Sequence, residues 1–161
     1  MSETPPKADI LLALRKTLAD ELATLERVAA MSRDEAISEE TRSENDFDTR
    51  ATEASYLARG LAGRITSMRK LLGWFQELDV SKPLQPPVVQ LGALIALEGA
   101  GDELLFMAPV GRGQVQAGRW KVNIISPSSP LGGALEELEA GDEAEVITPR
   151  GVTTREILGV W

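Results

Sequence analysis

The sequence predicts an α+β protein, in which a long antiparallel helical hairpin precedes a small, mainly antiparallel β-sheet with one short helix. Three observations support this prediction. Apolar residues recur every three or four positions through the first half of the chain, which is the spacing of one helix face. Residues 79–87 then contain three prolines in nine residues. Beyond them, short β-branched segments separated by glycine or proline indicate strands.

The first helix is expected over residues 5–37. Thr4 can cap it, and Pro5 suits the first helical position because a proline there loses no helical hydrogen bond. No glycine or proline interrupts the chain between residues 8 and 59. The mainly apolar stripe of this helix follows a spacing of three and four residues, through Leu11, Leu14, Leu18, Glu21, Leu25, Val28 and Ser32, with Leu22 and Ala29 beside it.

A second helical stripe consists of Ala54, Leu57, Leu61, Ile65, Met68, Leu72 and Phe75, with Leu71 and Leu78 beside it. Two such stripes can bury their apolar faces on each other, as an antiparallel coiled-coil hairpin. At about 1.5 Å rise per residue, about 30 residues give an arm of roughly 45 Å. The turn is expected near residues 38–46, where Ser43 and Asp46 resemble a capping box for the second helix.

The predicted domains are a helical hairpin at 1–78, a semi-rigid proline-rich linker at 79–87 and a sheet domain at 88–161. We expect four to six strands, taken from the segments 88–99, 103–111, 120–126, 143–151 and 152–161. Ser129 and Pro130 should begin a short helix over residues 131–138. A hairpin should turn at 149–151, and the glycine-rich stretch 111–119 is interpreted as a loop and not as a phosphate cradle.

Composition excludes several classes of protein. The chain has 161 residues, 43% of them apolar, with no cysteine and no histidine, so disulfides, thiolate or imidazole metal sites and histidine-based catalysis are excluded. No apolar run is long enough to cross a membrane and no signal peptide is recognisable, so we expect a cytoplasmic protein. The net charge of −8 argues against direct nucleic-acid binding.

That negative charge is local. Residues 34–48 contain seven acids and one base, Arg42, a charge of −6, so the rest of the chain carries only −2. The acids would therefore gather at the tip of the predicted hairpin, at about residues 38–48. Solubility and the dipole of a helix N-terminus explain such a cluster without any function.

Several segments resemble the bacterial Gre-type (GreA/GreB) transcript-cleavage factors. In the C-terminal half these are ISPSSPLGGAL at 125–135, AGDEAEVITPRG at 140–151 and REILGVW at 155–161. In the N-terminal half, SENDFDTRATEASYLARGLAGRI at 43–65 is similar to the Ser-Glu-Asn tip of the Gre coiled coil and the helix that descends from it. The resemblance implies an FKBP-like fold for the C-terminal domain.

The resemblance also implies a function in trans. Gre factors insert their coiled coil into the secondary channel of RNA polymerase, where tip carboxylates help to hold the second catalytic Mg²⁺ for cleavage of backtracked RNA. The implied catalytic residues are Glu44, Asn45 and Asp46, with Glu44, Asp46 and Glu40 as Mg²⁺ ligands only when docked. Phe47, Arg50, Ser128, Ser129 and Pro130 are the implied partner-binding residues. The resemblance implies no stably bound cofactor, no enzyme activity of the protein's own and no contact with a membrane. Nucleic acid would be reached only through the polymerase. We expect a monomer.

Other interpretations remain open for individual residues. Glu44 and Asp46 could be surface or helix-capping residues instead of Mg²⁺ ligands, and Arg50 could pair with Glu53 within one helix. Phe47 could pack within the turn or in the polymerase channel. Ser129 and Pro130 also have a purely structural explanation, as helix cap and first helical residue.

One departure from the family pattern keeps the function open as well. The Gre cleavage motif reads Asp-x-x-Glu-Asn, but Thr41 stands in this chain where the family has the aspartate. The alternative is therefore a protein that occupies the secondary channel and inhibits or modulates the polymerase without stimulating cleavage. Two further alternatives are a coiled-coil interaction protein unrelated to transcription and an FKBP-type prolyl isomerase, which would need an aromatic-lined pocket.

Overall fold

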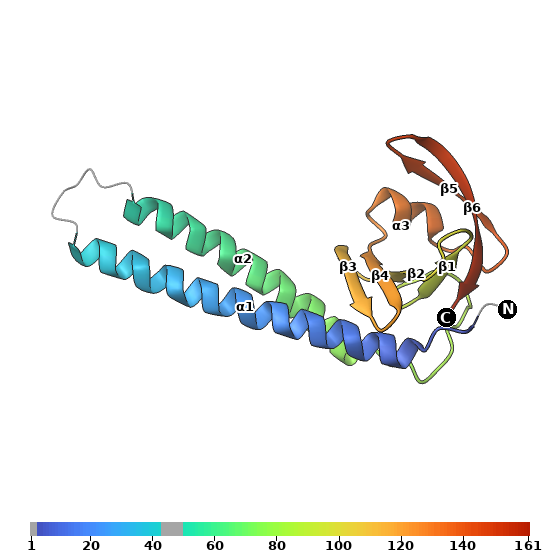
Figure 1. The fold of residues 1–161 in the computed structure, drawn as a ribbon, viewed down its shortest axis with the longest axis horizontal. Coiled ribbons are helices and arrows are strands. Elements are labelled where there is room, and N and C mark those ends of the chain that lie inside the picture. Colours follow the sequence, from blue (N-terminus) through green and yellow to red (C-terminus); the bar gives the residue numbers. More distant parts are fainter. Residues whose placement is uncertain (1–2, 43–49) are drawn as a thin grey trace. The chain divides into compact units, whose positions relative to one another are not determined.

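The computed structural model describes residues 3–42 and 50–161 and contains three helices and six strands in that part of the chain (Figure 1). Its contacts divide the chain into two compact units, and each is described separately below. One unit comprises Arg15–Gln76, and the other comprises Met1–Leu14 together with Glu77–Trp161. No helix in the described ranges is long and apolar enough to span a membrane.

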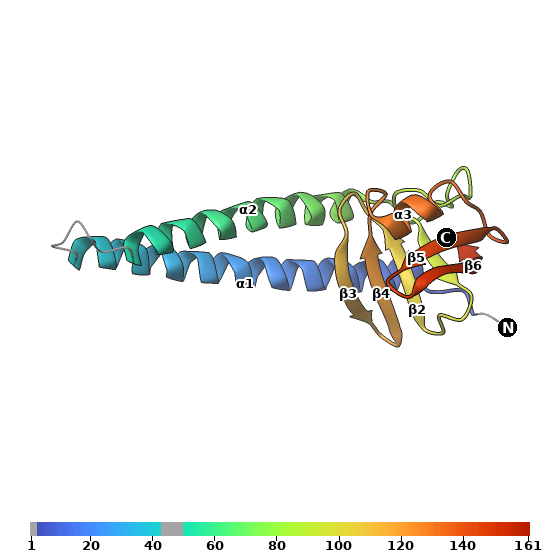
Figure 2. The ribbon, with the colours of Figure 1, turned by 90° about the horizontal axis from the view of Figure 1, so that it is seen from above.

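Two long helices, α1 (Lys7–Arg42) and α2 (Arg50–Glu77), run side by side in opposite directions (Figures 1 and 2). With 36 residues, α1 is about 54 Å long. Arg15 on α1 donates to the carbonyl oxygens of Phe75, at 2.8 Å, and Gln76, at 3.3 Å. Since α2 has no basic residue in its last turn, Arg15 supplies the positive charge that favours a helix C-terminus.

The ends of the first helix differ from those predicted. Thr4 and Pro5 precede the helix, and the Pro6 carbonyl accepts the first helical bond, from the Ile10 N–H at 3.0 Å. Residues 38–42, expected in the turn, continue α1. The Ser43–Asp46 capping box lies outside the described residues.

Most positions of the predicted stripes are buried, which confirms them, but two positions nearer the connecting segment are not. Val28 is 43% exposed and Leu57 is 57% exposed, so neither belongs to the buried seam. Ala29 is buried instead and forms a cluster with Leu61 and Ile65, against which Leu22 and Leu25 pack. The small side chain of Ala29 is therefore buried here in place of the larger Val28.

The C-terminal part contains a six-stranded sheet in the order β3-β4-β2-β1-β6-β5. All described neighbours are antiparallel except β2 and β4, so the sheet is mixed but mainly antiparallel, as predicted. The strands are β1 (Leu94–Leu97), β2 (Glu103–Met107), β3 (Arg112–Ala117), β4 (Trp120–Ile125), β5 (Glu143–Thr148) and β6 (Gly151–Val160). The prediction of a loop at 111–119 was wrong, because Val115 and Ala117 are buried and Arg112–Ala117 pairs with β4.

Helix α3 (Pro130–Leu135) lies between β4 and β5 in the chain and packs against β5. It begins at Pro130 as expected but ends earlier than predicted, because Glu136 leaves the helical conformation. The core beneath it is aliphatic and consists of Val89, Ala93, Ile95, Leu97, Met107, Ile125, Leu135, Ala144 and Ile157. Leu84 from the predicted linker also packs against this core.

The sheet ends in a hairpin that the sequence predicted and in a C-terminal tryptophan. The β5–β6 hairpin turns between Thr148 and Gly151, which face each other, and Gly151 has a positive φ of 124°. Trp161 exchanges both backbone hydrogen bonds with Leu94, and its indole covers Gly159 so closely that a Cβ there would overlap the ring. The other two tryptophans are Trp74 on α2, whose ring meets Phe75 edge to face, and Trp120 on β4.

Candidate functional site

The acidic residues that the sequence singled out lie at or near the segment that joins α1 to α2. Glu44, Asn45, Asp46 and Phe47 lie outside the described residues. Glu40 belongs to the last turn of α1, and Arg50 is the first residue of α2; only the backbone of these two is described. In the described residues, no group of three or more acidic side chains is placed to hold a metal ion.

The second predicted site is the loop before α3, which the structure describes fully. Ser129 caps the helix: its hydroxyl accepts from the Gly132 N–H at 3.0 Å and donates to the Ser126 carbonyl at 2.7 Å. Ser128 and Pro130 are exposed on either side of it, and the Ser128 hydroxyl lies 2.9 Å from that of buried Ser126. Ser129 is thus occupied in positioning the loop, while Ser128 and Pro130 are accessible.

Gly132 makes this loop possible. A Cβ on Gly132 would overlap the Ser126 carbonyl oxygen, the same atom that accepts the Ser129 hydroxyl. The chain can therefore fold back over the start of α3 only where residue 132 has no side chain. The glycines of the SPLGGAL stretch have a packing reason in addition to any binding role.

A cavity of about 200 Å³ lies beside this loop, and Leu131 connects the two because it follows Pro130 and lines the cavity. The apolar side chains in its lining are Leu97, Ala100, Leu105, Leu131 and Val146. The polar ones are Glu103, Asn123, Thr148, Thr153 and Arg155. This volume lies below the range of about 300–1,000 Å³ for small-molecule pockets, so it suits a single side chain of a partner better than a cofactor. None of the lining residues is aromatic, which argues against the prolyl isomerase interpretation.

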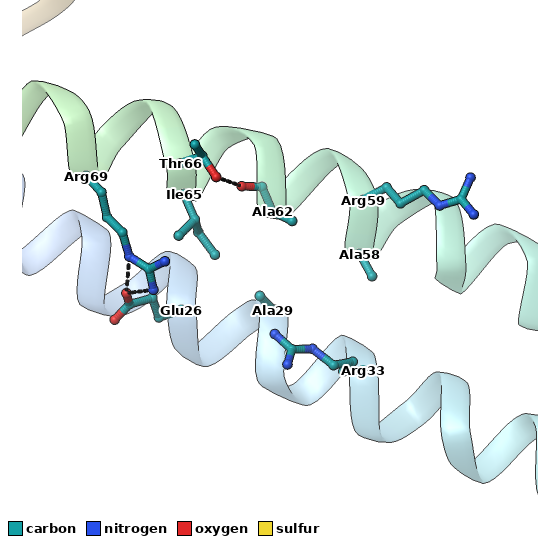
Figure 3. A pocket seen from close by; sticks show the side chains of 9 residues that line it. All are labelled: Glu26, Ala29, Arg33, Ala58, Arg59, Ala62, Ile65, Thr66 and Arg69. Atoms are coloured by element: carbon teal, nitrogen blue, oxygen red, sulfur yellow. Dashed lines mark hydrogen bonds and ion pairs between the residues drawn. The ribbon is translucent and has the colours of Figure 1, made fainter.

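A second, larger hollow lies between α1 and α2 (Figure 3). It measures about 550 Å³ and is lined by Glu26, Ala29, Arg33, Ala58, Arg59, Ala62, Ile65, Thr66 and Arg69. The Glu26 carboxylate accepts from the Arg69 guanidinium at 2.7 and 3.2 Å and so joins the two helices at one end. We call this hollow the arginine groove.

Sequence reasoning missed the arginine groove. Its signal is present in retrospect: Ala29, Ala58 and Ala62 stand at or beside the apolar stripes, where a well-packed helix pair carries larger residues. The groove is also lined by Arg33 on the same helix as Ala29, and by Arg59 and Arg69 on the same helix as Ala58 and Ala62.

Lys7 is a further residue in an unusual environment. Its ammonium donates to the Trp161 carbonyl oxygen at 2.7 Å, which ties the start of α1 to the end of β6. Burial lowers the pKa of Lys7 to about 8, because desolvation disfavours the charged form.

The architecture is that of an α+β protein with a helical hairpin and a separate sheet domain, and comparison with known proteins identifies its family. The chain is 32% identical over 151 residues to transcription elongation factor GreA of Francisella tularensis subsp. novicida, a match that covers 92% of this chain and 89% of the relative. GreA of Francisella tularensis subsp. holarctica strain LVS gives the same values. Residues 88–161 match the family described as transcription elongation factor GreA/GreB, C-terminal part. The chain belongs to the GreA/GreB family of transcription elongation factors.

Two solved structures are also similar to this chain, at lower sequence identity. GreA factor homolog 1 of Thermus thermophilus is 18% identical, with 91% of this chain and 94% of that chain covered and a TM-score of 0.37. A GreA/GreB factor from Nitrosomonas europaea is 22% identical, with 80% and 92% covered and a TM-score of 0.35.

Proposed function

We propose that this protein binds RNA polymerase, places its helix pair in the secondary channel and stimulates cleavage of backtracked RNA by the polymerase's own active site. It acts as an accessory factor and not as an enzyme. One observation carries this proposal: a chain of the GreA/GreB family concentrates a charge of −6 in residues 34–48, around the segment that joins its two long helices.

The donor set in and beside this segment fits the proposed role. Glu40, Glu44 and Asp46 offer hard carboxylate oxygens, the ligands that Mg²⁺ takes in proteins, usually one or two together with phosphate oxygens. When bound, a second Mg²⁺ in the polymerase site would stabilise charge on the attacking and leaving oxygens. Of the protein's own groups, Glu44 and Asp46 would hold the ion and the Asn45 amide would orient a water by hydrogen bonding.

The C-terminal domain supplies the docking surface in this proposal. Ser128 and Pro130 project from a loop that Ser129 and Gly132 hold rigidly, and the neighbouring cavity offers an apolar floor. A rigid exposed loop beside a cavity the size of a side chain suits capture of one apolar anchor residue from a protein partner.

The test is an RNA-length assay on a backtracked elongation complex with Mg²⁺. The wild-type protein should shorten the RNA, and Glu44→Gln should reduce the rate by about tenfold or more, because the amide keeps the shape but loses the charge. Ser43→Ala serves as the control in the same segment. Equal cleavage rates with Glu44→Gln and wild type would refute the role of Glu44.

The second candidate function is inhibition by occupation of the channel, and Thr41 favours it. A threonine hydroxyl is a weaker Mg²⁺ ligand than the aspartate that Gre-type factors carry at this place in the motif. The same assay separates the two functions: an inhibitor would slow nucleotide addition without shortening the RNA.

A further inference from the structure

The arginine groove carries positive charge that the described residues do not fully neutralise. Arg69 is paired with Glu26, but neither Arg33 nor Arg59 makes a hydrogen bond or ion pair with any residue that the structure describes. The two lie on different helices, Arg33 on α1 and Arg59 on α2, and both line the same hollow (Figure 3). In a chain of net charge −8, two such guanidinium groups at one groove form a distinct local field.

The side chains at the bottom of the groove are apolar, and most of them are small. Ala29 and Ile65 are buried there, and Ala58 and Ala62 contribute only methyl groups. One turn beyond Arg33 along α1, Ile37 is 58% exposed, so the apolar surface continues past the groove. Two antiparallel helices with small side chains between them form a trough into which the side-chain ridge of a third helix can pack at about 8–10 Å between axes.

We propose that the arginine groove binds an acidic amphipathic helix of RNA polymerase. The helix would place an apolar side chain over Ala29 and Ala62 and its flanking carboxylates against Arg33 and Arg59. This inference rests on the proposed function, since it takes the polymerase as the partner, and it assigns a second contact to the helix pair, apart from the acidic residues and from the loop before α3.

A helix fits the groove better than a nucleic acid does. Single-stranded nucleic acid is usually held by aromatic side chains on which bases stack, and the groove has no aromatic residue among the described residues that line it. A phosphate backbone also requires an extended basic surface. Here Glu26 lies in the groove itself, and the exposed Asp34 and Glu35 follow Arg33 directly on α1. A partner with spaced carboxylates and an apolar ridge matches both the charge and the floor.

The first experiment measures binding to core RNA polymerase without RNA or DNA. The double variant Arg33→Glu/Arg59→Glu should bind about tenfold more weakly than wild type. The control Arg27→Glu/Arg64→Glu makes the same change in net charge with one exposed residue on each helix outside the groove, and it should bind like wild type. Ala62→Leu fills the groove with a good helix-forming residue and should weaken binding without any change in charge. Helix content by circular dichroism checks that all variants are folded.

The second experiment locates the contact with a benzophenone amino acid at Ala58 in the complex with polymerase. An adduct on an acidic helical segment of a polymerase subunit supports the proposal. It is overturned by an adduct on RNA or on a second copy of this chain, by no adduct in a complex that still forms, or by charge sensitivity that appears only with RNA present. If the wild-type protein does not bind polymerase at all, the proposed function is refuted together with this inference. That outcome is distinguishable from failure of the inference alone, because the control variant would then also fail to bind.

Discussion

At the scale of single residues, Ser129 has a structural role in its loop, whereas its neighbour Ser128 is accessible to a partner. Ser129→Ala should lower the free energy of unfolding by about 1 kcal/mol, because it removes the acceptor for the Gly132 N–H at a helix start. Ser128→Thr keeps the hydroxyl that lies 2.9 Å from that of buried Ser126, so it should change stability by less than about 0.5 kcal/mol. Its added methyl group should weaken polymerase binding, because Ser128 is exposed. Urea unfolding and a binding titration of both variants provide the test; equal effects on stability would contradict this division of roles.

Thr41 offers a gain-of-function test at the same scale. Thr41→Asp restores the carboxylate that Gre-type factors carry at this place, so it should increase cleavage of backtracked RNA by several-fold if ion capture limits the reaction. Glu35→Ala/Thr41→Asp, which keeps the net charge of the wild type, controls for an unspecific effect of added charge. No increase in either variant would indicate that the other carboxylates already suffice or that the protein does not stimulate cleavage.

Lys7 should make stability depend on pH. Its pKa is lowered to about 8 in the folded state from an ordinary value of 10.5, so the unfolded chain holds this proton more tightly. Between about pH 8 and 10.5 the contribution of Lys7 to stability therefore increases as the pH rises. Lys7→Met should flatten this part of the profile, measured as the urea midpoint at pH 7, 8, 9 and 10. Identical slopes for both proteins would contradict the assignment.

At the scale of elements, α2 contains three glycines that its packing does not require. Apart from the neighbouring backbone of α2 itself, no atom of the described residues lies within 4 Å of a Cβ placed on Gly60, Gly63 or Gly73. Gly63→Ala should stabilise the protein by about 0.5–1 kcal/mol, because alanine loses less backbone entropy in a helix. Gly132→Ala is the contrasting variant, since its Cβ would overlap the Ser126 carbonyl, and it should be strongly destabilising. Thermal unfolding distinguishes the two; a destabilised Gly63→Ala would show that the exposed glycine has another role.

Elements with strong local signals were predictable from the sequence. The helical spacing of leucines located α1 and α2, and Ser129-Pro130 located the start of α3. The β3 strand was missed because its glycines suggested a loop, whereas pairing with β4 decides its conformation. Val28 and Leu57 were wrongly assigned to the seam, because periodicity alone does not show where two helices stop packing closely.

At the scale of the whole molecule, the docking proposal can be tested on one strand with two adjacent residues. Thr153 lines the cavity beside the Ser128–Pro130 loop, whereas Thr154 pairs with Glu145 on the opposite face of the β5–β6 hairpin. Thr153→Trp should fill the cavity and weaken binding to core polymerase by about tenfold, and Thr154→Trp should not. Tryptophan suits a strand in both places. Equal binding by the two variants would exclude the cavity as the docking site.

The candidate site was predictable to different degrees. Motifs in the sequence led to the Ser128–Pro130 loop, and its geometry then distinguished Ser129, which caps α3, from its exposed neighbours. The roles of Glu40, Glu44, Asn45, Asp46, Phe47 and Arg50 stay predictions. The arginine groove could not be predicted, because a hollow depends on how two distant segments pair and not on either one alone.

The distribution of the tryptophans has a practical consequence. Trp74 lies in one unit, against Phe75, while Trp120 and Trp161 lie in the other, the latter over Gly159. The chain therefore contains its own optical reporters for each half. The fluorescence of Trp74→Phe would report on unfolding of the sheet, and that of Trp120→Phe/Trp161→Phe on fraying of the hairpin. Binding of a partner to either part could therefore be observed without any attached dye.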